Sequence, residues 1–257
     1  MRRVIFLGTG DPLNGERAQT SLALPLPADE TMLIDASSGT VLLNRLEAAG
    51  IPPESVRHLF LGHRHFDHVG GLAPLITALA ASPEASLLVY AAPETLRTVR
   101  DLLDLTLPGS EGWLGNRLGW RELTLGKPTE VGKFEVTPFP LDHGLECVGF
   151  RVVQAGAVAV FAVDTRPTRE IVEYARGADL LVHDAYGPQS AAKKAHTMGH
   201  STATEAGEVA RAAGVRRLIL THLRSSRFVD PGALAAEAES AFGEPVSAAE
   251  DLDIVEF

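Results

Sequence analysis

The sequence predicts an α/β protein with a four-layer αββα sandwich, built as one domain over residues 1–257. Short runs of β-type residues alternate with helical patterns along the whole chain, and no low-complexity linker interrupts them. Both halves of the chain are rich in such runs, and each half carries helical segments that can cover one sheet. Two sheets packed face to face, with helices outside them, bury the apolar face of every element.

In the first half, strands are expected where short apolar runs end at turn residues, and helices where apolar residues recur at helical spacing. The expected strands cover residues 3–8, 21–25, 31–35, 57–61 and 86–90. The expected helices cover residues 40–49, 72–81 and 93–105.

The least regular stretch is 107–119, which contains Pro108, several glycines and Trp113, and which borders Trp120. A long irregular segment with large aromatic residues is often a lid or the wall of a substrate pocket. A loop that packs over the core fits the same pattern equally well, and the sequence leaves both interpretations open.

The second half repeats this style without any repeat at the level of residues. The expected strands cover residues 134–141, 148–154, 158–163, 179–183 and 216–221. The expected helices cover residues 168–176, 202–214 and 231–241.

The composition is typical of an intracellular enzyme. With 257 residues and 45% hydrophobic content, the chain can bury a large core. Cys147 is the only cysteine, which excludes an internal disulfide and a thiolate zinc site. The net charge of −10 argues against broad attraction to nucleic acid. The apolar run near the first residue is too short for a signal peptide, and no apolar run in the chain is long enough to span a membrane. We therefore expect a cytoplasmic protein without membrane contact.

A dense group of metal-ligand side chains follows the expected strand 57–61. Residues 63–68 read His-Arg-His-Phe-Asp-His. Imidazole nitrogen and carboxylate oxygen are ligand types that zinc and similar dications accept. A polar turn that happens to be rich in histidine is the alternative. The Gly70-Gly71 pair that follows favours the metal interpretation, because it allows the tight turn that a metal loop needs.

Three further candidates come at or just after the ends of later expected strands. They are His143, Asp164 and His222. Strand ends hold the backbone fixed while the loops release the side chains, so a sandwich would gather such residues into one cleft. Each of them alone is more often an ordinary turn residue. Together with the cluster at 63–68 they predict a metal centre.

At this point the sequence resembles the metallo-β-lactamase superfamily, through the His-x-His-x-Asp-His signature and the order and rough spacing of the later His, Asp and His. The resemblance covers about residues 1–225 and implies a metallo-β-lactamase-like sandwich with two divalent metal ions, zinc first and Mn²⁺ or Fe²⁺ as alternatives. It implies that one metal is held by His63, His65 and His143. It implies that the second is held by Asp67, His68 and His222, and that both are bridged by Asp164.

A narrower resemblance points to the ribonuclease Z-like branch. The chain has its Gly-Thr-Gly loop at 8–10, an Asp that closes the third strand at Asp35, and a His-Ser-Thr segment that begins at His200. By this resemblance Asp35 orients a ligand histidine, while His200 donates a proton or stabilises charge at the scissile group. The acidic partner of that histidine is a Glu in the branch and Asp184 here, one methylene shorter. The expected catalytic residues are Asp67, His200 and Asp184.

The chain departs from tRNA-processing ribonuclease Z in one place. Those enzymes typically insert a long tRNA-binding arm between the third and fourth metal motifs, whereas only 20 residues separate His143 from Asp164 here. This favours a small ester substrate over tRNA.

We therefore expect a hydrolase of phosphodiesters or related sulfate esters. The alternatives are a tRNA 3′-endonuclease, then a lactone or thioester hydrolase that could use Tyr186, or a non-catalytic metal-binding relative. A homodimer is possible, as in relatives of this branch.

Overall fold

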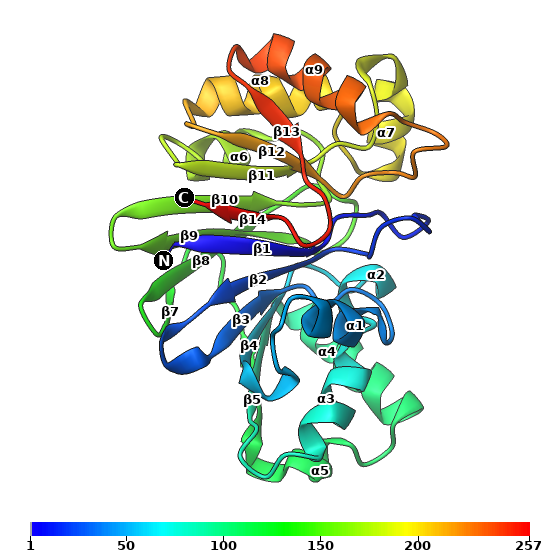
Figure 1. Ribbon diagram of the computed structural model, residues 1–257, viewed down its shortest axis with the longest axis vertical. Coiled ribbons are helices and arrows are strands. Elements are labelled where there is room, and N and C mark those ends of the chain that lie inside the picture. Colours follow the sequence, from blue (N-terminus) through cyan, green and yellow to red (C-terminus); the bar gives the residue numbers. More distant parts are fainter. Residues whose placement is uncertain (1) are drawn as a thin grey trace.

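The computed structural model describes residues 2–257 and confirms the four-layer αββα sandwich (Figure 1). Two seven-stranded sheets pack face to face, and helices cover their outer faces. The first sheet has the order β14 (Ile254–Glu256), β1 (Arg3–Gly8), β2 (Ser21–Pro25), β3 (Thr31–Ile34), β4 (Val56–Leu61), β5 (Leu87–Ala91) and β6 (Leu118–Glu122). The second has the order β13 (Val246–Ala248), β12 (Leu218–Thr221), β11 (Leu180–Asp184), β10 (Ala157–Ala162), β9 (Val148–Gln154), β8 (Phe134–Pro140) and β7 (Thr129–Val131).

Each sheet changes from antiparallel to parallel pairing partway across. In the first sheet the change falls at β3, and in the second at β10. Parallel neighbours need a crossover, and helices supply it. The first sheet uses α1 (Val41–Ala48), α2 (Phe66–Val69), α3 (Leu72–Ala80), α4 (Pro93–Thr106) and α5 (Glu111–Leu114). The second uses α6 (Arg169–Tyr174), α7 (Ala192–Met198), α8 (Ala203–Ala213) and α9 (Pro231–Phe242).

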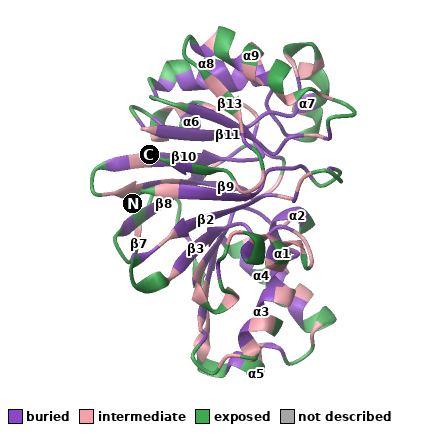
Figure 2. Cartoon of the chain, viewed as in Figure 1, coloured by how far each residue is buried: buried purple, intermediate pink, exposed green. Residues whose placement is uncertain are grey.

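Three apolar layers hold the sandwich together. One lies between the sheets, and the others lie between each sheet and its helices; together they form the buried bands of Figure 2. Alternation along β4 shows how a strand serves two layers. Phe60 joins the central layer, whereas Leu59 and Leu61 join the layer under the first set of helices. This packing fixes the end of β4, from which the first ligand group emerges.

The expectation for 107–119 was incomplete. This stretch contains α5 and leads into β6, in which Trp120 pairs with Val89 of β5. The strands that the sequence did not predict are β6, β7, β13 and β14, which are the four edges of the two sheets. Edge strands pair on one side only, and three of these four have only three residues, so they need little of the apolar alternation that identifies a strand.

Among residues 2–257, no helix is both long and apolar enough to cross a bilayer; even α4 has only 14 residues.

Candidate metal centre

Seven His and Asp side chains converge at one end of the sandwich, just beyond the carboxyl ends of four strands. The cluster at 63–68 follows β4, and the three later residues follow β8, β10 and β12, one after each strand. The structure thus brings together every residue that the sequence nominated as a metal ligand. Their role as ligands stays a prediction, which the geometry below makes specific.

The first ligand set consists of His63, His65, His143 and Asp164. Nδ1 of His65 lies 2.9 Å from Nε2 of His63 and 3.2 Å from Nε2 of His143. Oδ2 of Asp164 lies 3.4 Å from the His63 nitrogen and 3.6 Å from the His143 nitrogen. Tetrahedral zinc bound to nitrogen at its usual distance keeps its ligand atoms about 3.3 Å apart. The set therefore has the spacing of a four-coordinate site.

The second ligand set consists of Asp67, His68, His222 and again Asp164. Nε2 of His68 lies 3.3 Å from Oδ2 of Asp67 and 3.2 Å from Oδ2 of Asp164. Nε2 of His222 lies 3.1 Å from Oδ1 of Asp164. Both oxygens of Asp164 thus face ligand nitrogens, which is the arrangement a carboxylate needs to bridge two cations.

A cation would resolve the unpaired atoms of the second set. Oδ2 of Asp67, Nε2 of His68 and Oδ1 of Asp164 are buried, and none has a hydrogen-bond partner within residues 2–257. Buried polar atoms are nearly always paired, because an unpaired one loses its hydration without compensation. Three such atoms aimed at one point fit a bound dication. A nitrogen and oxygen donor set is compatible with zinc, manganese or iron.

Asp35 holds His68 from behind, as the sequence predicted. Nδ1 of His68 donates to Oδ2 of Asp35 at 2.7 Å, and the N–H of Gly62 donates to Oδ1 at 2.7 Å. The carboxylate therefore fixes both the ring of His68 and the backbone where the motif begins. An outer carboxylate of this kind orients the ring and makes its inner nitrogen a stronger ligand.

Two more ligand histidines are oriented by contacts that the sequence did not reveal. Nδ1 of His143 donates to the carbonyl of Gly199 at 2.8 Å, and Nε2 faces the centre. Nδ1 of His222 lies 2.8 Å from Oγ1 of Thr20. Thr20 is 202 positions away in the chain, so no local pattern could have identified it.

Backbone strain is concentrated at the same place. Asp35, Asp164 and His222 have φ angles of 60°, 61° and 56°, in the left-handed region that residues other than glycine rarely adopt. Such conformations persist only where the surrounding structure enforces them, and they cluster at functional sites. The strained backbone conformations thus fall at two of the predicted ligands, Asp164 and His222, and at Asp35, which orients His68.

Burial and charge set the protonation of the ligands. Burial lowers the pKa of His63, His65 and His222, which favours the neutral form that binds metals. Burial also lowers the pKa of His68, but the surrounding carboxylates outweigh it and raise that pKa well above its usual value. The carboxylates around His68 thus give the second set a negative charge, which a bound cation would neutralise.

His200 lies against both ligand sets. Its ring centroid is 4.9 Å from that of His143 and 5.4 Å from that of His222. Nδ1 donates to Oδ2 of the fully buried Asp184 at 3.0 Å, so the shorter acidic partner still reaches it. Burial lowers the pKa of His200, but the hydrogen bond to Asp184 and the charge of Asp164 outweigh it and raise the pKa overall. This favours a protonated imidazole beside the centre.

The segment that places His200 is fixed by the start of α8. Thr202 caps this helix, and its side chain and that of Glu205 form a reciprocal capping box. The N–H of Ser201 donates to Oδ2 of Asp184 at 3.3 Å. Two other histidines make contacts away from the ligand sets: Nδ1 of His58 lies 3.1 Å from the hydroxyl oxygen of Tyr90, and Nε2 of His196 lies 2.7 Å from Oε1 of Glu205.

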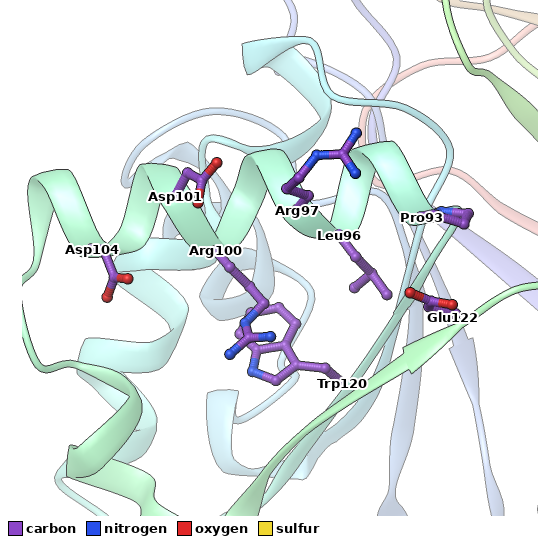
Figure 3. Close-up of a pocket in the computed structure, with 8 residues that line it drawn as sticks. All are labelled: Pro93, Leu96, Arg97, Arg100, Asp101, Asp104, Trp120 and Glu122. Atoms are coloured by element: carbon purple, nitrogen blue, oxygen red, sulfur yellow. The ribbon is translucent and has the colours of Figure 1, made fainter.

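A separate cavity of about 520 Å³ lies between α4 and β6 (Figure 3). Arg100 extends over the ring of Trp120, 5.6 Å from its centroid. None of the lining residues belongs to either ligand set. Trp120 therefore lines this outer cavity and packs against the apolar layer under the helices.

The fold and the two ligand sets together define the class of metal-dependent hydrolases. A family profile described as the β-lactamase superfamily domain matches residues 30–223. The chain is 30% identical to ribonuclease Z of Methanothermobacter thermautotrophicus, over 100% of this chain and 97% of that protein. This chain belongs to the β-lactamase superfamily, in its ribonuclease Z-like branch.

Solved structures show the same fold. The metallo-β-lactamase fold protein YhfI of Bacillus subtilis superposes with a TM-score of 0.85 at 22% identity, over 99% of both chains. The short form of human tRNase Z superposes with a TM-score of 0.78 at 23% identity, over 99% of this chain and 98% of that one.

Proposed function

We propose that this protein hydrolyses phosphodiester bonds in substrates smaller than tRNA, with two divalent metal ions at the centre described above. The observation that carries the proposal is the sharing of Asp164 by two ligand sets, with the ring of His200 against both. Dinuclear centres of this spacing suit in-line displacement at phosphorus. A sulfate ester has the same tetrahedral shape and is the next substrate class to test.

The chain's own residues account for most of the proposed chemistry. Bound dications would supply Lewis acidity and make water a stronger nucleophile near neutral pH. Asp67 and Asp164 hold negative charge at the centre, and they keep the ligand nitrogens aimed inward. Nε2 of His200 makes no hydrogen bond within residues 2–257, so it can donate a proton to a leaving oxygen. Asp184 keeps that imidazole oriented and protonated.

The size of the substrate is inferred from what the chain lacks. Its alignment with the Methanothermobacter ribonuclease Z spans 307 positions, about 50 more than the 257 residues of this chain. The interval from His143 to Asp164 is filled by β9, β10 and short turns. The second observation supports a protein without a long substrate-binding arm in that interval, and the first shows only that the relative has additional residues. The net charge of −10 also disfavours a large polyanion.

The test is a substrate panel with metal analysis. Purified protein loaded with Zn²⁺ or Mn²⁺ is assayed on bis(p-nitrophenyl) phosphate, an aryl sulfate, a lactone and a precursor tRNA. We expect turnover of the phosphodiester and two metal ions per chain. Turnover of the lactone alone would overturn the proposal, and two bound metals with no turnover on any substrate would support a non-catalytic relative.

A tRNA 3′-endonuclease is the second candidate, because the relatives at 30% identity bear the name ribonuclease Z. Cleavage of precursor tRNA with a kcat/KM well above that for the small diester would establish it. The predicted homodimer and cytoplasmic location stay predictions; light scattering of the purified protein tests the former.

A further inference from the structure

Arg224 is a mostly buried cation beside the metal centre, and the mechanism above does not use it. It follows the ligand His222 by two residues, and its side chain is 16% exposed. Its guanidinium lies between two aromatic rings, with Cζ 4.8 Å from the centroid of Tyr186 and 4.7 Å from that of Phe228. Such stacking holds the plane of the guanidinium while leaving its N–H edges open.

Those N–H groups have no hydrogen-bond acceptor in the described part of the chain. Within residues 2–257 the side chain of Arg224 makes no hydrogen bond, and its nearest carboxylate oxygen, Oδ2 of Asp11, lies 4.0 Å from Nε. Arg166 offers the contrast, because it follows the ligand Asp164 by the same two residues. Arg166 donates to the carbonyl of His196 at 2.7 Å and to Oδ1 of Asp142 at 2.8 Å. The donors of Arg166 are hydrogen-bonded within the protein, whereas among residues 2–257 those of Arg224 face only the carboxylate of Asp11, beyond hydrogen-bond distance.

The stack that contains Arg224 leads directly to the centre. The ring of Tyr186 is stacked on that of His200 at 5.2 Å, and the ring of His200 is stacked on that of His222 at 5.4 Å. The guanidinium carbon of Arg224 therefore lies at most about 10 Å from the ring that faces the scissile bond. A substrate bound at the metals can reach it with the next charged group along its chain.

We propose that Arg224 forms a second anion subsite, which binds a phosphate group of the substrate next to the ester that is hydrolysed. A phosphate offers the paired oxygens that a planar guanidinium binds in bidentate fashion. The inference deepens the proposed function and rests on it for the identity of the reaction. It narrows the substrate class to diesters that carry a second phosphate, such as short nucleotides with a terminal phosphate.

The kinetic test uses two matched substrates: the p-nitrophenyl ester of thymidine 5′-phosphate, with and without a 3′-phosphate. For the unaltered enzyme we expect the 3′-phosphate to lower KM about 10- to 100-fold, the range of a charged hydrogen-bonded contact. Arg224→Met should abolish this advantage while kcat on both esters stays unchanged. Arg224→Lys should restore only part of it, because an ammonium lacks the planar donor pair.

Arg227→Met is the control, because it removes the same charge from an exposed arginine three residues along. An equal loss with this variant would show diffuse electrostatics and overturn the subsite. Loss of bound metal or of kcat on both esters in Arg224→Met would also overturn it, since Arg224 would then act by supporting His222.

A binding measurement separates failure of the subsite from failure of the proposed function. Calorimetric titration of the metal-loaded protein with thymidine 3′,5′-bisphosphate and with thymidine 5′-monophosphate needs no turnover. Tighter binding of the bisphosphate that depends on Arg224 supports the subsite even if neither ester is hydrolysed. Equal affinity for the two ligands overturns the subsite whether or not the esters are hydrolysed.

Discussion

The two ligand sets differ in how completely the protein encloses them. Every member of the second set is buried, and its histidines are held from behind by the side chains of Asp35 and Thr20. The first set includes the exposed His65, whose outer ring nitrogen has no hydrogen bond within residues 2–257. The second set also has two carboxylates, against one in the first, if the shared Asp164 is counted in both.

This difference leads us to expect different metal affinities and different roles for the two positions. A buried, carboxylate-rich position attracts a cation strongly, because low dielectric increases the Coulomb term. We expect the more open first position to exchange its ligand more readily and to face the incoming substrate. We therefore expect the enclosed position to fill first on metal titration. Four variants test or sharpen the comparison.

The largest effect is expected where the two sets meet. Asp164→Asn removes the charge and the second oxygen that both positions share, so both metals should be lost and turnover should fall to the level of buffer. Metal content by mass spectrometry and activity on bis(p-nitrophenyl) phosphate measure the two effects. Asp142→Asn is the control, because this exposed carboxylate next to His143 points to Arg166 instead. Retention of both metals by Asp164→Asn would show that the sets do not depend on a shared ligand.

His200 belongs to neither set, and its loss should separate chemistry from metal binding. His200→Gln is expected to lower kcat by about 10²–10⁴, the range for a general acid, while two metals stay bound. His196→Gln provides the control, since this partly exposed histidine contacts Glu205 and neither ligand set. A loss of metal in His200→Gln would mean that this residue supports the ligands.

Asp35→Asn should weaken only the enclosed position. Loss of the carboxylate behind His68 is expected to reduce metal affinity there about 10- to 100-fold, as for other outer partners of ligand histidines. Competition with a chromogenic chelator measures the two affinities separately. Equal weakening of both positions would show that Asp35 acts on the loop as a whole.

The smallest expected effect is a change in pH dependence. Asp184 raises the pKa of His200, so Asp184→Asn should lower that pKa and move the alkaline fall in kcat to lower pH. At pH values below the alkaline fall of both the variant and the unaltered protein, the variant should retain activity. A pH profile of kcat from bis(p-nitrophenyl) phosphate measures the shift, and an unchanged profile would mean that a group other than His200 sets the alkaline limb.

Most of the strands that the sequence predicted correctly are buried on both faces, although β8 carries the exposed Glu135. In β4, β10 and β12 continuous apolar runs are needed because helices or the opposite sheet cover each side, and such runs are visible without a structure. The four edge strands were missed because one-sided pairing imposes little pattern on residues such as those of β6. The sequence placed Trp120 beside a stretch that could form a pocket wall, but it did not show that the cavity lined by Trp120 contains no member of the ligand sets.

The sequence by itself determined which side chains could form the centre, because metal ligation needs particular side chains and His63, His65, Asp67 and His68 lie within a few positions of one another. Only the tertiary structure decided which residues orient them and what else reaches the centre. Thr20, Gly199 and Arg224 come from segments that meet only when the two sheets pack together. Local spacing specifies a ligand loop, but contacts between distant strand ends depend on the register and packing of the whole sandwich.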